Sequence, residues 1–338
     1  MGDNGGIAPV RCVKVDGRFF TMQREENKMI FCVYMNPTID KTVYFDIFRV
    51  GGTNRPDKIV VDAGGKGINV AVELATLGQP VKVVGVMTSN DREFFEERLN
   101  AQGVLSDFVI IGKSARVNTK LFDRSNQRIT EVNEAGPELS ADVLDAVRQK
   151  IFAAAEEGDI VVLTGSLPRG CPTDFYAMLI RELHNKNIRS VLDADGDALK
   201  AAVKERPYMV KPNIDELSML MGDMLKERDE IEHACKQLHE QGIRIVAVSM
   251  GADGAMISDG NGICYAQPMK VDILSTVGAG DSLVAGMVAR DGMSLQEMLR
   301  SGVAAATGSI TLEGTKLCTR ELYDKYYPLV RVLSIDDP

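Results

Sequence analysis

The sequence predicts an α/β protein built on a doubly wound, mostly parallel sheet. Short apolar, β-branched segments alternate with segments of helical periodicity over most of the chain, which is typical of parallel strands joined by helices. Glycine-rich turns follow the strands, at the edge where such sheets bind ligands. Two segments, at about 42–62 and 116–134, contain only strands, so we expect them to pair as a small separate sheet.

Composition narrows the class of protein. A chain of 338 residues with 45% apolar and 26% charged residues fits one large α/β domain. A net charge of −9 argues against nucleic acid or an anionic membrane as a partner. No apolar run reaches the roughly 18 residues of a membrane helix, and the N-terminus lacks the apolar core of a secretory signal. We therefore expect a cytoplasmic protein.

Cysteine and histidine offer no catalytic pattern. The six cysteines lack metal-site spacing and are expected to be buried thiols in a reducing compartment. His184, His233 and His239 lie in charged, helical segments where we expect them to be exposed, away from every glycine-rich turn. Histidine-based catalysis is therefore not expected.

Residues 1–28 differ from the rest and are treated as an N-terminal extension to a domain at 29–338. Arg24-Glu25-Glu26 can be encoded by a ribosome-binding sequence at a suitable distance before Met29. We therefore expect Met29 to be the native start and the preceding residues to be a translated leader. The alternative is a short surface strand at 10–20, where apolar and polar residues alternate.

The elements follow from periodicity in chain order. Apolar and β-branched runs predict strands at 29–35, 42–48, 58–61, 81–86, 118–122, 128–132, 160–164, 190–193, 209–211, 245–249, 255–257 and 262–266. Helical spacing between glycine or polar boundaries predicts helices at 64–77, 91–102, 141–156, 173–185, 196–204, 214–221, 227–241, 281–290, 295–307 and 320–327.

The stretch from Ser275 to Ser282 is the candidate reaction centre. Glycines beside a small residue let successive backbone N–H groups turn toward one point, and the helix that follows adds its own unpaired donors. Such a junction suits a phosphate. A carboxylate there, Asp281, would repel the ligand unless it accepts a proton from an attacking hydroxyl. The alternative is an ordinary helix N-cap aspartate.

Six motifs in order resemble those of the ribokinase-like sugar kinases, in particular the phosphofructokinase-B group. They are Asn36-Pro-Thr-Ile-Asp40, Gly64-Gly-Lys-Gly-Ile-Asn69, Gly165-Ser-Leu-Pro168, Lys211-Pro-Asn-Ile-Asp-Glu216, Gly251-Ala-Asp-Gly254 and Thr276-Val-Gly-Ala-Gly-Asp281. Together they span about residues 29–320. The resemblance implies an αβα sandwich with a small β lid over a sugar, and ATP-dependent transfer to a sugar hydroxyl.

The resemblance also assigns roles at the phosphate. It implies that Gly278, Ala279 and Gly280 form an anion hole for the migrating charge and that Asp281 is the base. Lys211, Ser249, Gly251, Gly254 and Thr276 would meet the nucleotide.

A metal ion accompanies the nucleotide in this family. The resemblance implies that Asn213 and Glu216 hold Mg²⁺ through its waters. The same spacing is also that of a helix capping box, which leaves both readings open. A K⁺ ion held by backbone near Ser275 and Val277 is a further possibility.

The sugar side is expected to combine strand ends and a helix start. Asp40, at the end of a strand, would accept hydroxyl hydrogen bonds, although an Asx-turn after Asn36-Pro37 is the alternative. The remaining substrate candidates are Gly64, Gly65 and Asn69 at a helix start and Ser166 between the domains.

Basic residues indicate a sugar that already carries phosphate. Lys66, Arg55 and the Arg116-x-Asn118-x-Lys120 run could converge on one anion. The pattern is similar to the kinases of fructose 1-phosphate and tagatose 6-phosphate. Fructose 6-phosphate ranks below them, because its kinases usually lack the lysine at position 66. A solvated charged face is the alternative explanation for Arg55, Arg116 and Lys120.

We therefore expect an ATP-dependent hexose-phosphate kinase that phosphorylates O6 of fructose 1-phosphate, with transfer to O1 of tagatose 6-phosphate or fructose 6-phosphate as the alternative. Because one face of the small sheet would need cover, we expect a homodimer with clasped lids. A dinucleotide-binding oxidoreductase is the rival from another class, but the first strand does not lead into a G-x-G-x-x-G turn. A non-catalytic sugar-phosphate sensor is disfavoured by Asp281 and the two metal candidates.

Overall fold

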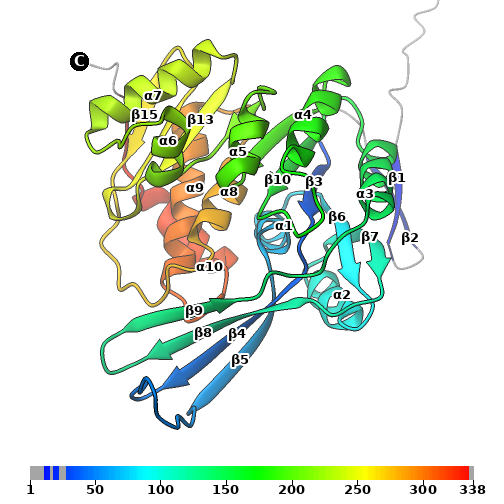
Figure 1. The fold of residues 1–338 in the computed structure, drawn as a ribbon. Coiled ribbons are helices and arrows are strands. Elements are labelled where there is room, and N and C mark those ends of the chain that lie inside the picture. Colours follow the sequence, from blue (N-terminus) through cyan, green and yellow to red (C-terminus); the bar gives the residue numbers. More distant parts are fainter. Residues whose placement is uncertain (1–10, 16–17, 23–27, 335–338) are drawn as a thin grey trace, which may run out of the picture.

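The computed structural model describes residues 11–15, 18–22 and 28–334 (Figure 1). Strands β1 (Arg11–Val15) and β2 (Arg18–Met22) pair as an antiparallel hairpin, in place of the single strand considered for 10–20. The expectation of a native start at Met29 concerns a segment that lies largely outside the described residues, and it stays a prediction.

A ten-stranded sheet forms the body, in the order β16-β15-β14-β13-β12-β11-β10-β3-β6-β7. The strands from β13 to β7 are parallel, and β14, β15 and β16 extend the sheet in antiparallel fashion. Their bounds are β3 Ile30–Tyr34, β6 Val81–Thr88, β7 Leu105–Ile111, β10 Ile160–Thr164, β11 Arg189–Asp193, β12 Met209–Val210, β13 Ile245–Ser249, β14 Ala255–Ser258, β15 Ile263–Ala266 and β16 Val332–Ser334. The expected doubly wound, mostly parallel sheet is confirmed.

Helices cover both faces of this sheet, which gives an αβα sandwich (Figure 1). Their bounds are α1 Lys66–Thr76, α2 Arg92–Ala101, α3 Ala141–Ala154, α4 Phe175–Asn185, α5 Gly196–Val203, α6 Ile214–Met221, α7 Arg228–Glu240, α8 Ala279–Val288, α9 Leu295–Ile310 and α10 Arg320–Tyr326. One buried apolar cluster joins α1, α2, α8, α9 and α10 to the sheet, and the other joins α3 to α7. None of these helices, within the part of the chain that is described, is both long and apolar enough to cross a membrane.

A second sheet projects from one end of the body, in the order β5-β4-β8-β9 (Figure 1). Its strands are β4 (Thr38–Phe45), β5 (Lys58–Gly64), β8 (Arg116–Asp123) and β9 (Arg128–Asn133). The central pair β4–β8 is parallel, and both outer pairs are antiparallel. The two strand-only segments therefore pair as predicted, and we call this four-stranded sheet the lid.

Several boundaries differ from the sequence-based expectation. β4 begins at Thr38, so Asp40 lies inside a strand and the Asx-turn reading is wrong. Helix α8 begins at Ala279. The glycine-rich turn before it ends a stretch without strand at 267–278, so this turn does not directly follow a strand, contrary to expectation. Strands β7 and β16 were not predicted.

The cysteines and histidines largely behave as expected. Cys32, Cys235, Cys264 and Cys318 are buried cysteines and Cys171 is a half-buried one, and the structure pairs none of these five in a disulfide. The side chain of Cys12 lies outside the described residues. His184 and His233 are exposed, but His239 is half-buried, with its ring nitrogens bonded to Ile243 O and Ser258 Oγ.

Candidate active site

A cavity of about 570 Å³ lies where the lid faces the carboxyl ends of the body strands. Eleven of its lining residues were predicted from sequence as catalytic or substrate-binding: Asp40, Gly65, Lys66, Asn69, Arg116, Asn118, Lys120, Ser166, Gly278, Gly280 and Asp281. Segments that are distant in sequence therefore meet in one place, as the motif order suggested.

Asp281 lies in the first turn of α8, with its side chain buried at the cavity wall. Its Oδ2 accepts a 2.9 Å hydrogen bond from Asn69 Nδ2 of α1. Burial raises the pKa of the Asp281 carboxyl to about 6, although the positive charge of Lys66 opposes the shift. The helix N-cap is Gly278, so the reading of Asp281 as an N-cap residue is wrong.

Two glycines shape the helix starts that face the cavity. Gly278 has φ +80° and Gly65 has φ +94°, conformations that other residues rarely adopt. A Cβ at Gly65 would lie 2.6 Å from the Tyr34 ring. Both positions therefore favour glycine, and each lies at a helix start, where the first N–H groups of an α-helix lack a carbonyl partner one turn back.

An ion triad, made by buried Asp193 and Lys211 and by part-exposed Lys66, lies beside Asp281. Lys66 Nζ and Lys211 Nζ each lie 3.1 Å from a carboxylate oxygen of Asp193, which also accepts a hydrogen bond from Thr164 Oγ1. Burial alone would raise the pKa of Asp193, but Lys211 and Lys66 outweigh it and hold the pKa at about 2. Two ammonium groups are thus fixed next to the start of α8.

The predicted metal pair forms a complete capping box. Asn213 Oδ1 accepts the Glu216 N–H, and Glu216 Oε2 accepts the Asn213 N–H, both at 2.8 Å. The capping-box alternative is therefore correct as a description of structure. Glu216 still contributes to the electrostatics of the site while it caps the helix, because it interacts electrostatically with Lys211 and Asp193.

The other predicted nucleotide residues lie outside the cavity lining. Ser249 bridges to Asn213 at the carboxyl ends of β12 and β13, and Gly251 and Gly254 form the turn that follows. Thr276 is exposed in the loop before α8, where its carbonyl accepts the Ala279 N–H at 3.4 Å. Ala279 itself is not part of the lining.

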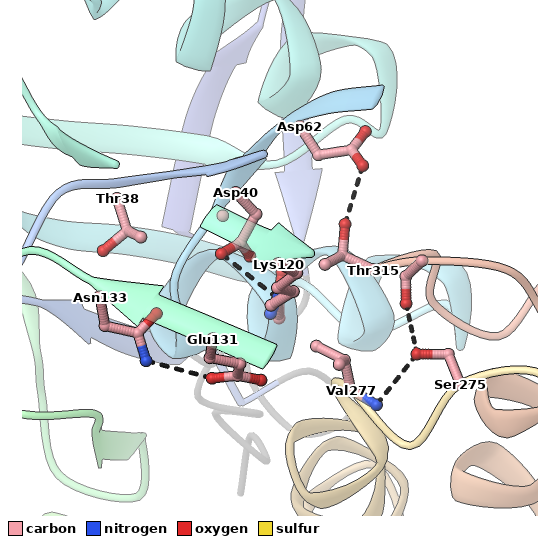
Figure 2. Close-up of polar contacts among 12 residues, drawn as sticks. Thr38, Asp40, Asp62, Lys120, Glu131, Asn133, Ser275, Val277 and Thr315 are labelled. Atoms are coloured by element: carbon pink, nitrogen blue, oxygen red, sulfur yellow. Dashed lines mark hydrogen bonds and ion pairs between the residues drawn. The ribbon is translucent and has the colours of Figure 1, made fainter. Parts of the chain in front are cut away.

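The lid presents a polar face to the cavity (Figure 2). Register places Asp62, Asp40, Asn118 and Asn133 in one row across the four strands. Lys120 and Glu131 stand opposite each other in the next row. The Oδ1 atoms of Asn118, and of Asn36 and Asn69 elsewhere in the lining, are buried without a hydrogen-bond partner. Buried acceptors of this kind are suited to ligand hydroxyl groups.

The basic residues of the lid are not equivalent. Lys120 Nζ lies 3.4 Å from Asp40 Oδ1 with both side chains buried, so its charge is already matched. Arg116 instead donates to the neutral acceptors Thr38 Oγ1 and Glu134 O. Within the described part of the chain, no carboxylate lies within ion-pair distance of Arg116.

Some predicted substrate residues do not reach the cavity. Arg55 is exposed in the β4–β5 connection and is not part of the lining, so the three-way convergence that included it is wrong. Gly64 ends β5 instead of opening a helix, and the Asp40 carboxyl packs over it.

Sequence reasoning missed several lining or supporting residues. Asp193 and Thr164 are the last residues of β11 and β10, and the rule that ligands bind at strand carboxyl ends could have found them. Glu131 and Asn133 follow from the two-residue alternation of β9 once its partner is known. Tyr34 carried no signal; its hydroxyl joins Thr38 N and Gly64 O across three strands.

Comparison with known proteins agrees with this geometry. A family model described as pfkB family carbohydrate kinase matches residues 34–322. The chain is 35% identical over 309 residues to 1-phosphofructokinase of Bacillus subtilis, covering 91% of this chain and 100% of that protein. It is 31% identical over 310 residues to 1-phosphofructokinase of Vibrio cholerae, covering 91% and 98%.

Solved structures share the same fold. The phosphofructokinase-2 of Escherichia coli in complex with potassium superimposes with a TM-score of 0.84 at 30% identity, covering 89% of this chain and 99% of that one. Sequence and architecture thus agree over most of the chain, and this protein belongs to the pfkB family of carbohydrate kinases.

Proposed function

We propose that this enzyme transfers the γ-phosphoryl group of ATP to a hexose phosphate, and that fructose 1-phosphate is converted to fructose 1,6-bisphosphate. The observation that carries the proposal is the position of Asp281: a buried carboxylate at a helix start, on the wall of a polar cavity. The names of the Bacillus and Vibrio relatives support the choice of sugar.

The base role follows from the environment of Asp281. A general base works best when its pKa lies near the operating pH, and burial raises that of Asp281 to about 6. The sugar O6–H would give its proton to the carboxylate as O6 forms its bond to the γ-phosphorus and the bond to the leaving ADP oxygen breaks. The hydrogen bond from Asn69 would hold the carboxylate in position.

Charge on the moving phosphoryl group would be met from two directions. The amides from Gly278 to Gly280, at the start of α8, would form the anion hole. Lys66 and Lys211 lie beside them, and Asp193 holds both ammonium groups at 3.1 Å. Positioning and charge neutralisation are what phosphoryl transfer chiefly requires.

Recognition of a sugar that already carries phosphate would rest on Arg116. Arg116 lines the cavity, and its guanidinium has only neutral acceptors among its hydrogen-bond partners. Lys120, which Asp40 already neutralises, would act with Asp40, Asn118 and Asn133 on hydroxyl groups. This division of roles revises the expectation that all the basic residues bind the anion.

ATP would enter with Mg²⁺, which family membership implies. Glu216 and Asp193 supply carboxylates near Lys211, and Asn213 lies beside them. A metal held by few protein carboxylates, waters and nucleotide phosphates fits this set. The role of Mg²⁺ would be to neutralise phosphate charge. K⁺ near Ser275 and Val277 remains part of the proposal, and replacing K⁺ with Na⁺ at constant ionic strength would test it.

The substrate is tested by ranking sugars at equal MgATP. We expect kcat/KM to be highest for fructose 1-phosphate, then tagatose 6-phosphate and fructose 6-phosphate, with free fructose at least about a hundredfold lower. Comparable turnover of free fructose would refute the phosphate-binding role of Arg116. A higher kcat/KM for fructose 6-phosphate would move the proposal to transfer at O1.

We also propose a homodimer that buries the outer faces of two lids. That face is apolar where Ile59, Val61 and Val132 are each about half exposed. A tetrameric inhibited form of the Escherichia coli phosphofructokinase-2 has been solved, so light scattering with and without MgATP should distinguish dimer from tetramer. A monomer in both conditions would contradict the proposal.

A further inference from the structure

The lid and the anion hole both contact one short segment, residues 313–318, which we call the coupling loop (Figure 2). On the lid side, Thr315 Oγ1 donates a 2.8 Å hydrogen bond to Asp62 Oδ2 of β5. On the body side, Ser275 Oγ donates a 2.7 Å hydrogen bond to Gly314 O. The loop is therefore held between two parts of the cavity wall that come from distant stretches of the chain.

Each end of this path leads directly to the cavity lining. Asp62 is the cross-strand neighbour of Asp40, which lines the cavity. At the other end, Ser275 Oγ accepts the N–H of Val277 at 3.2 Å, and Val277 and Gly278 line the cavity at the start of α8. A path of hydrogen bonds and short backbone steps thus joins the lid row that contains Asp40 and Asp62 to the expected anion hole at the start of α8.

The two hydroxyl groups of the path are shielded from solvent. Thr315 and Ser275 are buried, at 4% and 5% exposure. A buried hydroxyl that loses its partner pays a desolvation cost, so the bonded and the broken arrangement differ in free energy. The coupling loop also packs against the anion hole directly, because a methyl group at Gly278 would lie 3.3 Å from Leu317.

We propose that Thr315 and Ser275 are positioning residues that couple the two walls of the site, an inference that rests on the proposed kinase function. Sugar that binds to the lid row containing Asp40 would order Asp62, its neighbour in that row. Asp62 would then hold the coupling loop through Thr315. The loop would in turn hold Ser275, which fixes the Val277–Gly278 amides in position for the phosphoryl group. Binding of sugar phosphate and of nucleotide should accordingly strengthen each other by equal factors.

The test is a thermodynamic cycle on the full-length protein by titration calorimetry. The Kd of fructose 1-phosphate is measured with and without a non-hydrolysable ATP analogue, with Mg²⁺ present. In the wild type we expect the analogue to tighten sugar binding by about tenfold. Thr315→Val removes the donor at constant size and should reduce this factor to about one, with kcat falling more than the KM for ATP rises.

Two further variants distinguish a loss of coupling between the sugar and nucleotide sites from a general destabilisation of the loop. Thr315→Ser restores the hydroxyl and should restore the factor. Lys58→Met breaks the exposed 3.2 Å ion pair between Lys58 and Glu313 of the same loop and should leave the factor unchanged, since exposed pairs contribute little. If Thr315→Val does not fold, Ser275→Ala takes its place in the cycle.

The proposal is overturned if Thr315→Val keeps the wild-type factor, if Lys58→Met loses it equally, or if the wild type shows no coupling. Failure of the proposed substrate would look different: the wild type would not bind fructose 1-phosphate at all. The same cycle is then run with the hexose phosphate that the wild type phosphorylates, and the same outcomes decide it.

Discussion

The two walls of the cavity are built on opposite plans. On the body wall, the charged groups are already matched: Asp193 lies between buried Lys211 and part-exposed Lys66, and Asp281 is bonded to Asn69. On the lid wall, Lys120 and Asp40 match each other, but Arg116 has only neutral acceptors and Asn118 Oδ1 has no hydrogen-bond partner. The body wall, where we propose that the reaction takes place, therefore has its charged side chains held in position before substrate binds. The lid wall, which we propose binds the sugar, keeps hydrogen-bonding groups that a ligand can still use.

The strongest test of this contrast is Asp281→Asn. The variant keeps the shape and the neighbour Asn69 but cannot accept a proton, so kcat should fall by about 10²–10⁴-fold while the Kd for ATP changes little. In the wild type, log kcat should fall as pH drops below about 6, the raised pKa of Asp281, because a protonated Asp281 carboxyl cannot act as the base. Near-normal turnover by the variant would remove Asp281 from the reaction.

The pre-organisation of the body wall also predicts a pH-dependent stability. Glu73 of α1, one turn beyond Asn69, is fully buried near Ser282 of α8, and burial raises its pKa to about 8. A raised carboxyl pKa means that the folded state holds the proton more tightly than the unfolded state. Stability should therefore fall as pH rises through the window between the unfolded and the folded pKa.

Glu73→Gln mimics the protonated side chain and should flatten that decline. Between pH 6 and 8 the wild type should lose about 2–3 kcal/mol of unfolding free energy from this group, and the variant should not. Chemical denaturation across pH measures the slope. Exposed Glu97 is the matched control, since Glu97→Gln should leave the slope as it is. A wild-type slope in Glu73→Gln would show that Glu73 is not the group responsible.

Arg116→Ala tests the lid wall. Loss of the guanidinium should raise the KM for fructose 1-phosphate by about tenfold or more, with a small effect on the KM for ATP. Arg128→Ala, on the exposed start of β9, is the control and should leave both constants near wild type. An equal rise in both constants would indicate a general distortion of the site and count against the division between the walls.

The smallest expected effect concerns the outer face of the lid. Val132→Lys places a charge on an exposed apolar position and should weaken the proposed dimer, seen as a concentration-dependent shift in light scattering. Lys236→Glu, on the exposed surface of α7 and away from the lid, is a charge change on a polar position and serves as control. Unchanged association in Val132→Lys would place the interface elsewhere.

The contrast also explains what could be predicted from the sequence. The body was largely predictable, because parallel strands have strong apolar runs and their carboxyl ends meet at one edge. Asp193 was missed because its role depends on two lysines from distant segments. The lid strands were predicted, but not the register that lets Lys120 reach Asp40 from the neighbouring row. The position of Arg55 outside the cavity was not predicted either, since no local pattern fixes how a long connection folds back.

The parallel pairing of β4 with β8 has a consequence for assembly. Residues 38–45 and 116–123 are separated in the chain by β5, α1, β6, α2 and β7, of which β6 and β7 belong to the large sheet. Pairings this far apart in sequence carry a high loop-closure entropy. Because β10 to β16 of the large sheet follow β8 in the chain, the lid strands would leave the ribosome before most of the core that supports them.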